Sequence, residues 1–360
     1  MNKKFRLIKL LPIIVIILVL SGIGLCLYMV SPTGKSSEAV DFNIEYGTSP
    51  RDVIHNLKSS DLIKSEKFTL VYLKLNKISG INAGEFHLNK GMSLKKIFEV
   101  LTTTGFVKGE SIEMTFLPGH TYMDYVKTIS KKLEISESEV LNTIKDKDYI
   151  NSLIEKYWFL TNVILNTDIY YPLEGYLAGD TYEFKKDVTV KEVIEKLLDQ
   201  EKNILDKFKT NIDKSNYSIH EIMTLASISE KEGKKLEDRK NIVGVFINRL
   251  NNGDKLGSDV TTYYSLGLKL YERDLTYDEI ITPNAYNTRS DNLAGKLPVG
   301  PICNPSKDAI DSVINYTSND YYYFVSDKNS KIYFTKTFEE HEAKVNELQE
   351  NGLWFEYDEE

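Results

Sequence analysis

The stretch 218–251 constrains the fold more than any other part of the chain, because it encodes two long helices that meet at a glycine. Ser218 is a favourable N-cap, and Glu221 three residues later completes the pattern of a capping box. Gly233 is typical of a helix end, and a second apolar stripe follows over 242–250. The first stripe consists of Ile219, Ile222, Met223 and Ala226. The pattern predicts a pair of packed helices at the centre of a largely helical domain.

Glu230 continues the first stripe four residues after Ala226, where the pattern asks for an apolar residue. A carboxyl group held against apolar neighbours resists ionisation, so its pKa rises, as a general acid near neutral pH requires. The alternative is a solvated carboxylate at a frayed helix end. The position therefore indicates a catalytic acid without establishing one.

An apolar run over 10–30 follows four basic residues in 1–9. About 20 apolar residues suffice to cross a bilayer, and the basic flank favours a cytoplasmic N-terminus. We expect a single-pass anchor in the cell membrane, with the rest of the chain outside the cytoplasm. The alternative is a cleaved signal peptide.

A short repeat follows a polar linker over 31–40. Gly47-Thr48-Ser49 and Gly91-Met92-Ser93 each precede apolar residues at the same offsets, so each predicts a turn, a serine N-cap and a helix. The alternative is ordinary helix capping, which recurs in many proteins. We expect a small α+β subdomain over 41–108, of a kind that outside the cell often binds wall glycans.

The remaining part, 109–360, is predicted to be mostly helical with long loops, a hairpin over 321–334 and a closing helix over 337–349. The stretch 170–184 is aromatic and rich in turn residues, which predicts a loop that lines a cleft, and it carries a second carboxylate of interest, Glu174. The predicted fold class is therefore α+β, with a transmembrane helix, a small subdomain and a helical catalytic domain.

Several function classes are excluded by the residues that the chain lacks. Its formal net charge of −8 argues against nucleic-acid binding. No phosphate-binding glycine loop, dinucleotide motif or serine-hydrolase elbow occurs. Five scattered histidines and two distant cysteines favour neither a metal site nor a disulfide, and no cofactor is expected. What remains is carboxylate chemistry among loops rich in Tyr, Asn and Thr, which is typical of glycan cleavage.

Five separated motifs then occur in one order. They are ASISEKE at 226–232, VFINRL at 245–250, SD at 258–259, AYNT at 285–288 and LPVGPICNP at 297–305. This set closely resembles the YceG-like endolytic murein transglycosylases, and the similarity runs along the whole chain. The serine-capped repeat is similar to that family's LysM-like subdomain, and LEGY at 173–176 matches a further motif.

The resemblance implies a mechanism in which Glu230 is the catalytic acid and base. Such enzymes cut the bond from N-acetylmuramic acid to N-acetylglucosamine within peptidoglycan strands and leave 1,6-anhydro ends. The family role implied is termination of nascent glycan strands beside penicillin-binding synthases. Substrate binding or orientation is expected of Glu174, Asn248, Asp259, Tyr286, Asn287 and Thr288.

The chain departs from the family pattern at Ser229, Ala178-Gly179, Val260, Arg289 and Ile332. These changes put substrate fit in question more than the chemistry. One alternative is a muramidase that hydrolyses the same bond and uses Glu174 or Asp259 to activate water. Another is a wall-binding scaffold for the synthases with an inactive site.

Overall fold

The computed structural model describes residues 21–44, 48–78, 80–82, 84–103, 111–270 and 272–354. The chain divides into two compact units. The first runs to Glu113 and includes Glu183–Lys186, and the second contains Met114–Tyr182 and Asp187–Glu360. The predicted domains, 41–108 and 109–360, stay predictions.

The predicted transmembrane helix requires a correction. Residues 10–20 of that run lie outside the described residues, and the helix that is described there covers only 21–30. Within the described ranges, no helix combines the length and the apolar character needed to cross a membrane. The fold class is α+β, mostly helical with small sheets.

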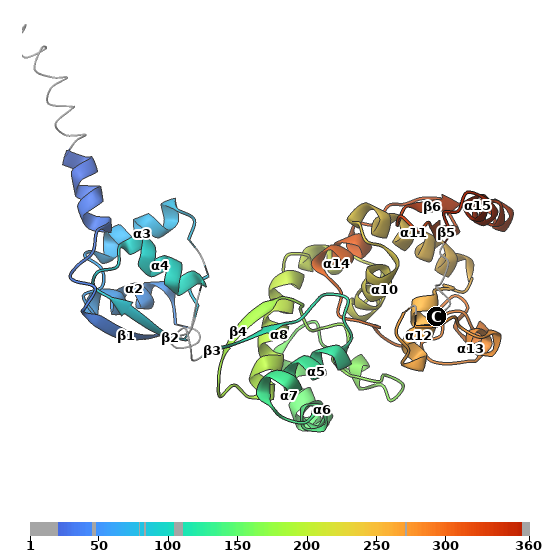
Figure 1. Ribbon diagram of the computed structural model, residues 1–360, viewed down its shortest axis with the longest axis horizontal. Helices are drawn as coiled ribbons and strands as arrows, with labels where there is room; N and C mark the ends of the chain where they lie inside the picture. The colour runs from blue at the N-terminus through green and yellow to red at the C-terminus, as the bar shows by residue number, and fades with distance from the viewer. Residues whose placement is uncertain are drawn as a thin grey trace, which may run out of the picture. The chain divides into compact units, whose positions relative to one another are not determined.

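The first unit is built on a two-stranded antiparallel sheet covered by helices (Figure 1). Strands β1 (Ala39–Ile44) and β2 (Gly84–Asn89) place Phe42 opposite Phe86, and both rings are buried. The helices are α2 (Pro50–Ser59), α3 (Glu66–Leu75) and α4 (Leu94–Thr103).

Both predicted serine caps occur in this unit. Ser49 accepts from the backbone N–H of Asp52, and Ser93 accepts from that of Lys96 at 3.3 Å. Gly47 of the first repeat lies outside the described residues.

The second unit begins with a group of helices. Its helices are α5 (Tyr122–Leu133), α6 (Glu137–Lys145), α7 (Lys147–Lys156), η1 (Asn162–Leu165), α8 (Val190–Leu205) and α9 (Lys209–Ile212). Strand β4 (Thr181–Lys185) pairs with β3 (Ser111–Thr115). The sequence predicted a loop at β4, but the buried Tyr182 and Phe184 alternate with more exposed residues as a strand requires.

Helix α10 (Ile219–Glu232) forms the centre of the second unit. It packs against α11 (Leu236–Asn252), α12 (Asp259–Leu266) and α14 (Lys307–Ile314) (Figure 1). Every residue over 222–229 is buried, so the helix is enclosed on all sides and not only along one stripe. The predicted capping box of Ser218 with Glu221 is confirmed, and the two helices end at Gly233 and Gly253.

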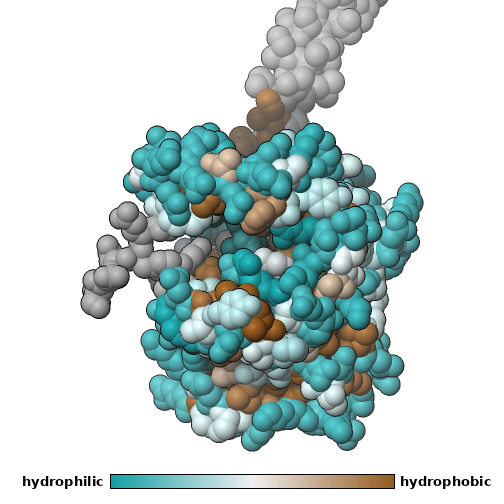
Figure 2. Space-filling model, turned by 90° about the vertical axis from the view of Figure 1, so that its right-hand side faces the viewer, coloured by the Kyte–Doolittle hydropathy of each residue, from teal (hydrophilic) through white to brown (hydrophobic). Residues whose placement is uncertain are grey.

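The loops after α11 contain more helix than the sequence predicted. Helix α12 begins inside 257–262, which the sequence predicted to be irregular, whereas α13 (Tyr277–Ile281) and the short η2 (Asp291–Leu293) lie where no element was predicted. The predicted hairpin and closing helix are confirmed as β5 (Tyr323–Ser326), β6 (Ile332–Thr335) and α15 (Phe338–Glu350). On the face shown in Figure 2, hydrophilic residues predominate and hydrophobic ones gather in small patches.

Candidate active site

Glu230 lies in the last turn of α10, where the enclosed helix reaches the edge of the core. Only 11% of its side chain is exposed. Its Oε1 accepts a hydrogen bond from Nη2 of Arg239 on α11 at 2.7 Å. Its Oε2 accepts from the backbone N–H of Ser306 at 3.0 Å and from the Ser306 hydroxyl. The predicted apolar surroundings are therefore replaced by hydrogen-bond donors on both carboxylate oxygens.

Gly119, in the turn before α5, lies against the side chain of Glu230. Gly119 has a φ of +79°, and a Cβ added to it would lie 3.4 Å from Cγ of Glu230. The N–H of Gly119 donates to the carbonyl oxygen of Asn304 at 2.7 Å. The turn before α5 is thus held closely against the carboxylate-bearing side chain.

Glu174 lies in a different, closed environment. Only 1% of the residue is exposed. The backbone N–H of Tyr122, the first residue of α5, lies 2.9 and 3.0 Å from its two oxygens. The hydroxyl of Tyr264 on α12 donates to Oε2 at 3.1 Å. Burial raises the pKa of Glu174 to about 8, against the hydrogen bonds that lower it. The structure therefore encloses this carboxyl group away from solvent.

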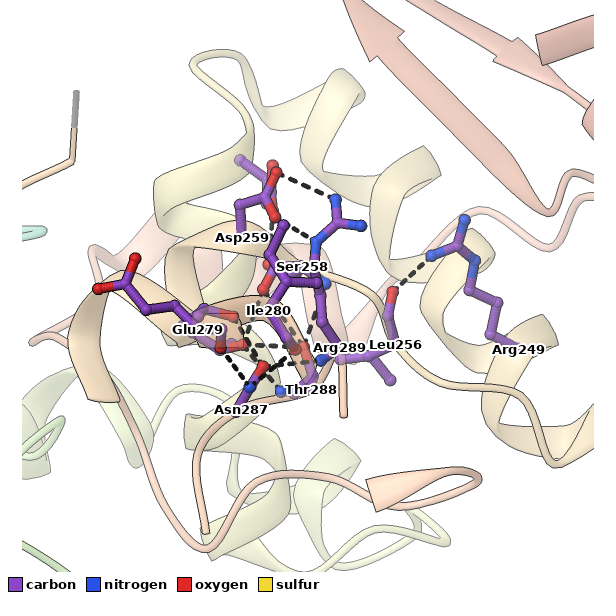
Figure 3. A network of polar contacts seen from close by, with 12 residues as sticks. Arg249, Leu256, Ser258, Asp259, Glu279, Ile280, Asn287, Thr288 and Arg289 are labelled. Atoms are coloured by element: carbon purple, nitrogen blue, oxygen red, sulfur yellow. Dashed lines mark hydrogen bonds and ion pairs between the residues drawn. The ribbon is translucent and has the colours of Figure 1, made fainter. Parts of the chain in front are cut away.

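Asp259 is the predicted binding residue that is most open to solvent. It stands at the start of α12 and forms a two-point ion pair with Arg289 (Figure 3). The exposed fractions of the two side chains are 49% and 37%. Arg289 is one of the positions at which this chain departs from the family pattern. Its positive charge offsets the negative charge of Asp259.

Asn287 and Thr288 lie beneath this pair and are buried (Figure 3). The amide nitrogen of Asn287 donates to the carbonyl oxygens of Glu279, Ile280 and Thr282 at 2.8–3.1 Å. The hydroxyl oxygen of Thr288 accepts a hydrogen bond from the backbone N–H of Ser258 at 3.1 Å. Asn287 thus holds the loop that follows α13 against the end of that helix, and Thr288 ties the loop to the start of α12.

Tyr286 lies inside the protein, and the partly buried Asn248 is held by backbone carbonyls. Tyr286 is fully buried, and its ring centre lies 4.8 Å from that of the half-exposed Tyr170. The side-chain nitrogen of Asn248 donates to the carbonyl oxygens of Asn319 and Tyr321 at 3.0 and 2.9 Å. It therefore joins α11 to the segment that leads into the β5–β6 hairpin.

The predicted residues thus fall into separate clusters. Asp259, Asn287 and Thr288 share one network, whereas Glu230 and Glu174 each have their own partners. Sequence reasoning missed Arg239 and Ser306, the two residues that bind Glu230. Ser306 carries a readable signal, because it follows a proline and caps α14 by accepting from Ala309 N–H. Arg239 stands on the next helix with no signal that sets it apart from a surface arginine.

Sequence reasoning also missed Glu232 as a buried acidic residue, because its position on the helix lies away from the first apolar stripe. The hydroxyl of Ser258, the N-cap of α12, donates to Glu232 and accepts no capping bond from α12. Burial raises the pKa of Glu232 to about 7, and the nearby Asp259 adds to the rise. Among the residues described, no cluster of three or more His, Cys, Asp or Glu is arranged to hold a metal ion.

Comparison with known proteins places these features in context. A model of the YceG-like family matches residues 42–347. The endolytic murein transglycosylase of Bacillus subtilis (strain 168) is 33% identical over 316 residues, which cover 87% of this chain and 86% of that protein. The protein of that name from Streptococcus pneumoniae (strain D39) is 30% identical over 327 residues, 87% of this chain but 59% of its own length. A YceG-like protein of Listeria monocytogenes, solved at 2.6 Å, aligns with a TM-score of 0.60 and 30% identity over 85% of this chain and 99% of its own.

Proposed function

The chain belongs to the YceG-like family. We propose that it cleaves murein glycan strands at internal bonds, as the names of its curated relatives describe. It is an enzyme, an endolytic lytic transglycosylase. The bond broken joins C1 of N-acetylmuramic acid to the oxygen on C4 of N-acetylglucosamine. The observation that carries the proposal is the nearly buried carboxylate of Glu230, oriented by donors from α11 and the start of α14.

Glu230 performs both proton transfers in this mechanism. In its acid form it gives a proton to the glycosidic oxygen as the C1–O bond breaks, and positive charge develops at C1. The resulting carboxylate removes the proton from the C6 hydroxyl of the same muramic sugar, and that oxygen forms the new bond to C1. The enzyme ends with the proton it began with, and no water is consumed. Because the nucleophile is tethered to the reacting sugar, it needs orientation more than activation.

The surroundings of the other carboxylates support this mechanism over hydrolysis. A hydrolase normally uses a second carboxylate, and Glu174 and Asp259 were the alternatives. Both oxygens of Glu174 are bonded in a closed environment, and Asp259 is paired with Arg289 at two points. Neither is free to activate water in this arrangement. The intact contacts of Glu230 likewise favour an active enzyme over a scaffold with an inactive site.

The remaining residues receive supporting roles. Asp259 contacts the glycan directly, while Asn287, Thr288 and Tyr286 shape the loop that carries Arg289. Glu174 supports α5 and α12, and Asn248 fixes α11. The subdomain 41–108 is a LysM-like module that holds the strand. Cleavage inside growing strands ends their elongation, outside the cytoplasm and beside penicillin-binding synthases.

The variant Glu230→Gln tests the proposal, since it keeps the side chain's shape and removes the transferable proton. Release of glycan fragments from purified strands should fall at least about a hundredfold, the usual contribution of acid–base help. Thermal unfolding should show that the variant is folded. Cleavage at the wild-type rate by the folded variant would exclude Glu230 as the acid.

A further inference from the structure

Tyr170 is a half-exposed tyrosine that several segments of the second unit hold in place. Of the whole residue, 44% is exposed. Its hydroxyl donates to the carbonyl oxygen of Ser265 at 3.2 Å and accepts from the side-chain nitrogen of Asn284, also at 3.2 Å. Its backbone N–H donates to the hydroxyl oxygen of Tyr286 at 3.4 Å. A single exposed apolar side chain is ordinary, but one that is bonded at both ends presents its ring in one orientation.

Two further tyrosines support this ring from one side. The ring centre of Tyr170 lies 5.8 Å from that of Tyr264, in a stacked arrangement, and 4.8 Å from that of Tyr286. The ring centres of Tyr264 and Tyr286 lie 4.9 Å apart. Because the two supporting rings are this close together, both lie on the same side of Tyr170. The exposed surface of the Tyr170 ring therefore lies on the side away from them.

The chemistry around Tyr170 is that of an uncharged ligand. The four residues that contact it are a serine, an asparagine and two tyrosines, all uncharged. A charged ligand would find no opposite charge among these contacts. A tyrosine ring offers an apolar face with a polar edge, and the Asn284 side chain adds amide groups beside that edge. A sugar ring has the complementary form, because its C–H face is apolar and its rim carries hydroxyl and amide groups.

A series of contacts connects these tyrosines to the surroundings of Glu230. The hydroxyl of Tyr264 donates to Glu174, which also accepts from the backbone N–H of Tyr122. Tyr122 begins α5 three residues after Gly119, and Gly119 lies against the side chain of Glu230. An enzyme that cuts a polymer at internal bonds must hold sugars on both sides of the bond. Tyr170 lies at the far end of this series, where a further sugar of the same strand would be held.

We propose that the open side of Tyr170 is a sugar-binding subsite, on which a sugar ring of the glycan strand stacks at a distance from the bond that is cut. This inference rests on the proposed function, which supplies the strand. Because the ring is already fixed, little conformational freedom is lost when the sugar binds. The subsite strengthens binding of long strands and takes no part in the proton transfers of Glu230.

The test uses full-length Glu230→Gln, in which cleavage is blocked, and measures its affinity for purified glycan strands by titration calorimetry. Adding Tyr170→Ala should weaken the binding of long strands about tenfold, a common loss when an aromatic contact is truncated. Short fragments that reach only the reacting sugars should bind the two proteins equally, whereas a general disturbance of the site would weaken both ligands. In the otherwise wild-type enzyme, Tyr170→Ala should raise KM for long strands about tenfold and leave kcat nearly unchanged.

Tyr316→Ala is the matched control, because this tyrosine exposes a similar 40% on the segment after α14. It should leave the binding of both ligands unchanged. If Tyr170→Ala does not fold, Tyr170→Leu gives the test instead, since leucine fills space against Tyr264 but has no flat ring.

Two outcomes would overturn this inference in the folded variant. One is an unchanged affinity and KM for long strands, and the other is an equal loss of affinity for short and long ligands. If Glu230→Gln still cleaves the strands, it is the proposed function that fails, and the KM of Tyr170→Ala still tests the subsite. The two failures are thereby distinguished.

Discussion

The hydroxyl of Tyr264 donates to Oε2 of Glu174 across 3.1 Å, and only 1% of Glu174 is exposed. A carboxyl group buried this completely resists ionisation in the folded protein. Its pKa is raised to about 8, whereas the ordinary value is 4.5. The folded state therefore retains a proton that the unfolded state releases over this interval.

This difference predicts a pH dependence of stability. Since the folded pKa is the higher one, the contribution of Glu174 is fully present below pH 4.5 and is lost as pH rises toward about 8. Relative to Glu174→Gln, the wild type should lose up to about 1.4 kcal/mol of unfolding free energy per pH unit within the interval. Urea unfolding of both proteins at pH 4.5 and at about pH 8 measures this difference in unfolding free energy.

Other buried carboxyl groups do not obscure that comparison. Burial also raises the pKa of Glu201 to about 8 and that of Glu232 to about 7. Both groups are present in the wild type and in the variant, so their contributions cancel. An identical pH dependence of the two proteins would show that Glu174 ionises normally.

Gly119→Ala tests the contact between the turn before α5 and Glu230. The added methyl would lie 3.4 Å from Cγ of Glu230, at a backbone φ of +79° that alanine tolerates poorly. We expect a loss of about 1 kcal/mol in stability or more and a loss of about tenfold to a hundredfold in glycan cleavage, because small displacements at a catalytic group are costly.

Gly253→Ala is the matched control for that variant. Its φ is +77°, and an added Cβ meets nothing within 4 Å. It should lose similar stability but keep the wild-type rate of cleavage. Equal losses of activity in the two variants would mean that backbone strain, and not the contact with Glu230, is responsible.

Asp259→Asn separates a surface role from a structural one. The pair with Arg289 is about half exposed, so removing its charge should change stability by less than about 1 kcal/mol. If Asp259 contacts the glycan, KM should rise while kcat is largely kept, as steady-state cleavage of soluble strands can show. A large drop in melting temperature with an unchanged KM would assign Asp259 a purely structural role.

Local patterns predicted much of the fold. The capping box at Ser218, the serine caps of α2 and α4, and the hairpin followed by α15 all depend on neighbours within a few residues. Strand β4 was missed because aromatic residues and turns concealed a two-residue alternation. Helix α12 was missed because its start was assigned to an irregular segment, 257–262, on its glycine content, although Ser258 stands at the N-cap.

The site was less accessible to sequence reasoning, because its contacts join distant segments. Ser306 lies 76 residues from Glu230 along the chain, and no local pattern relates the two. Asn287 has the polarity expected of a binding residue, yet it donates to three backbone carbonyls at the end of α13 and its C-cap. Residue type alone does not distinguish an amide that binds a ligand from one that replaces a missing backbone hydrogen bond.

The chemical form of the new strand ends tests the central claim most directly. Purified glycan strands are digested by the full-length enzyme in water enriched in heavy oxygen, and the muramic ends are analysed by mass. If Glu230 alone serves the C6 hydroxyl, the new ends carry no heavy oxygen, are non-reducing and are one water lighter than hydrolysed ends. Labelled, reducing muramic ends would contradict the account and show that a second group, such as Asp259 or Glu174, activates water.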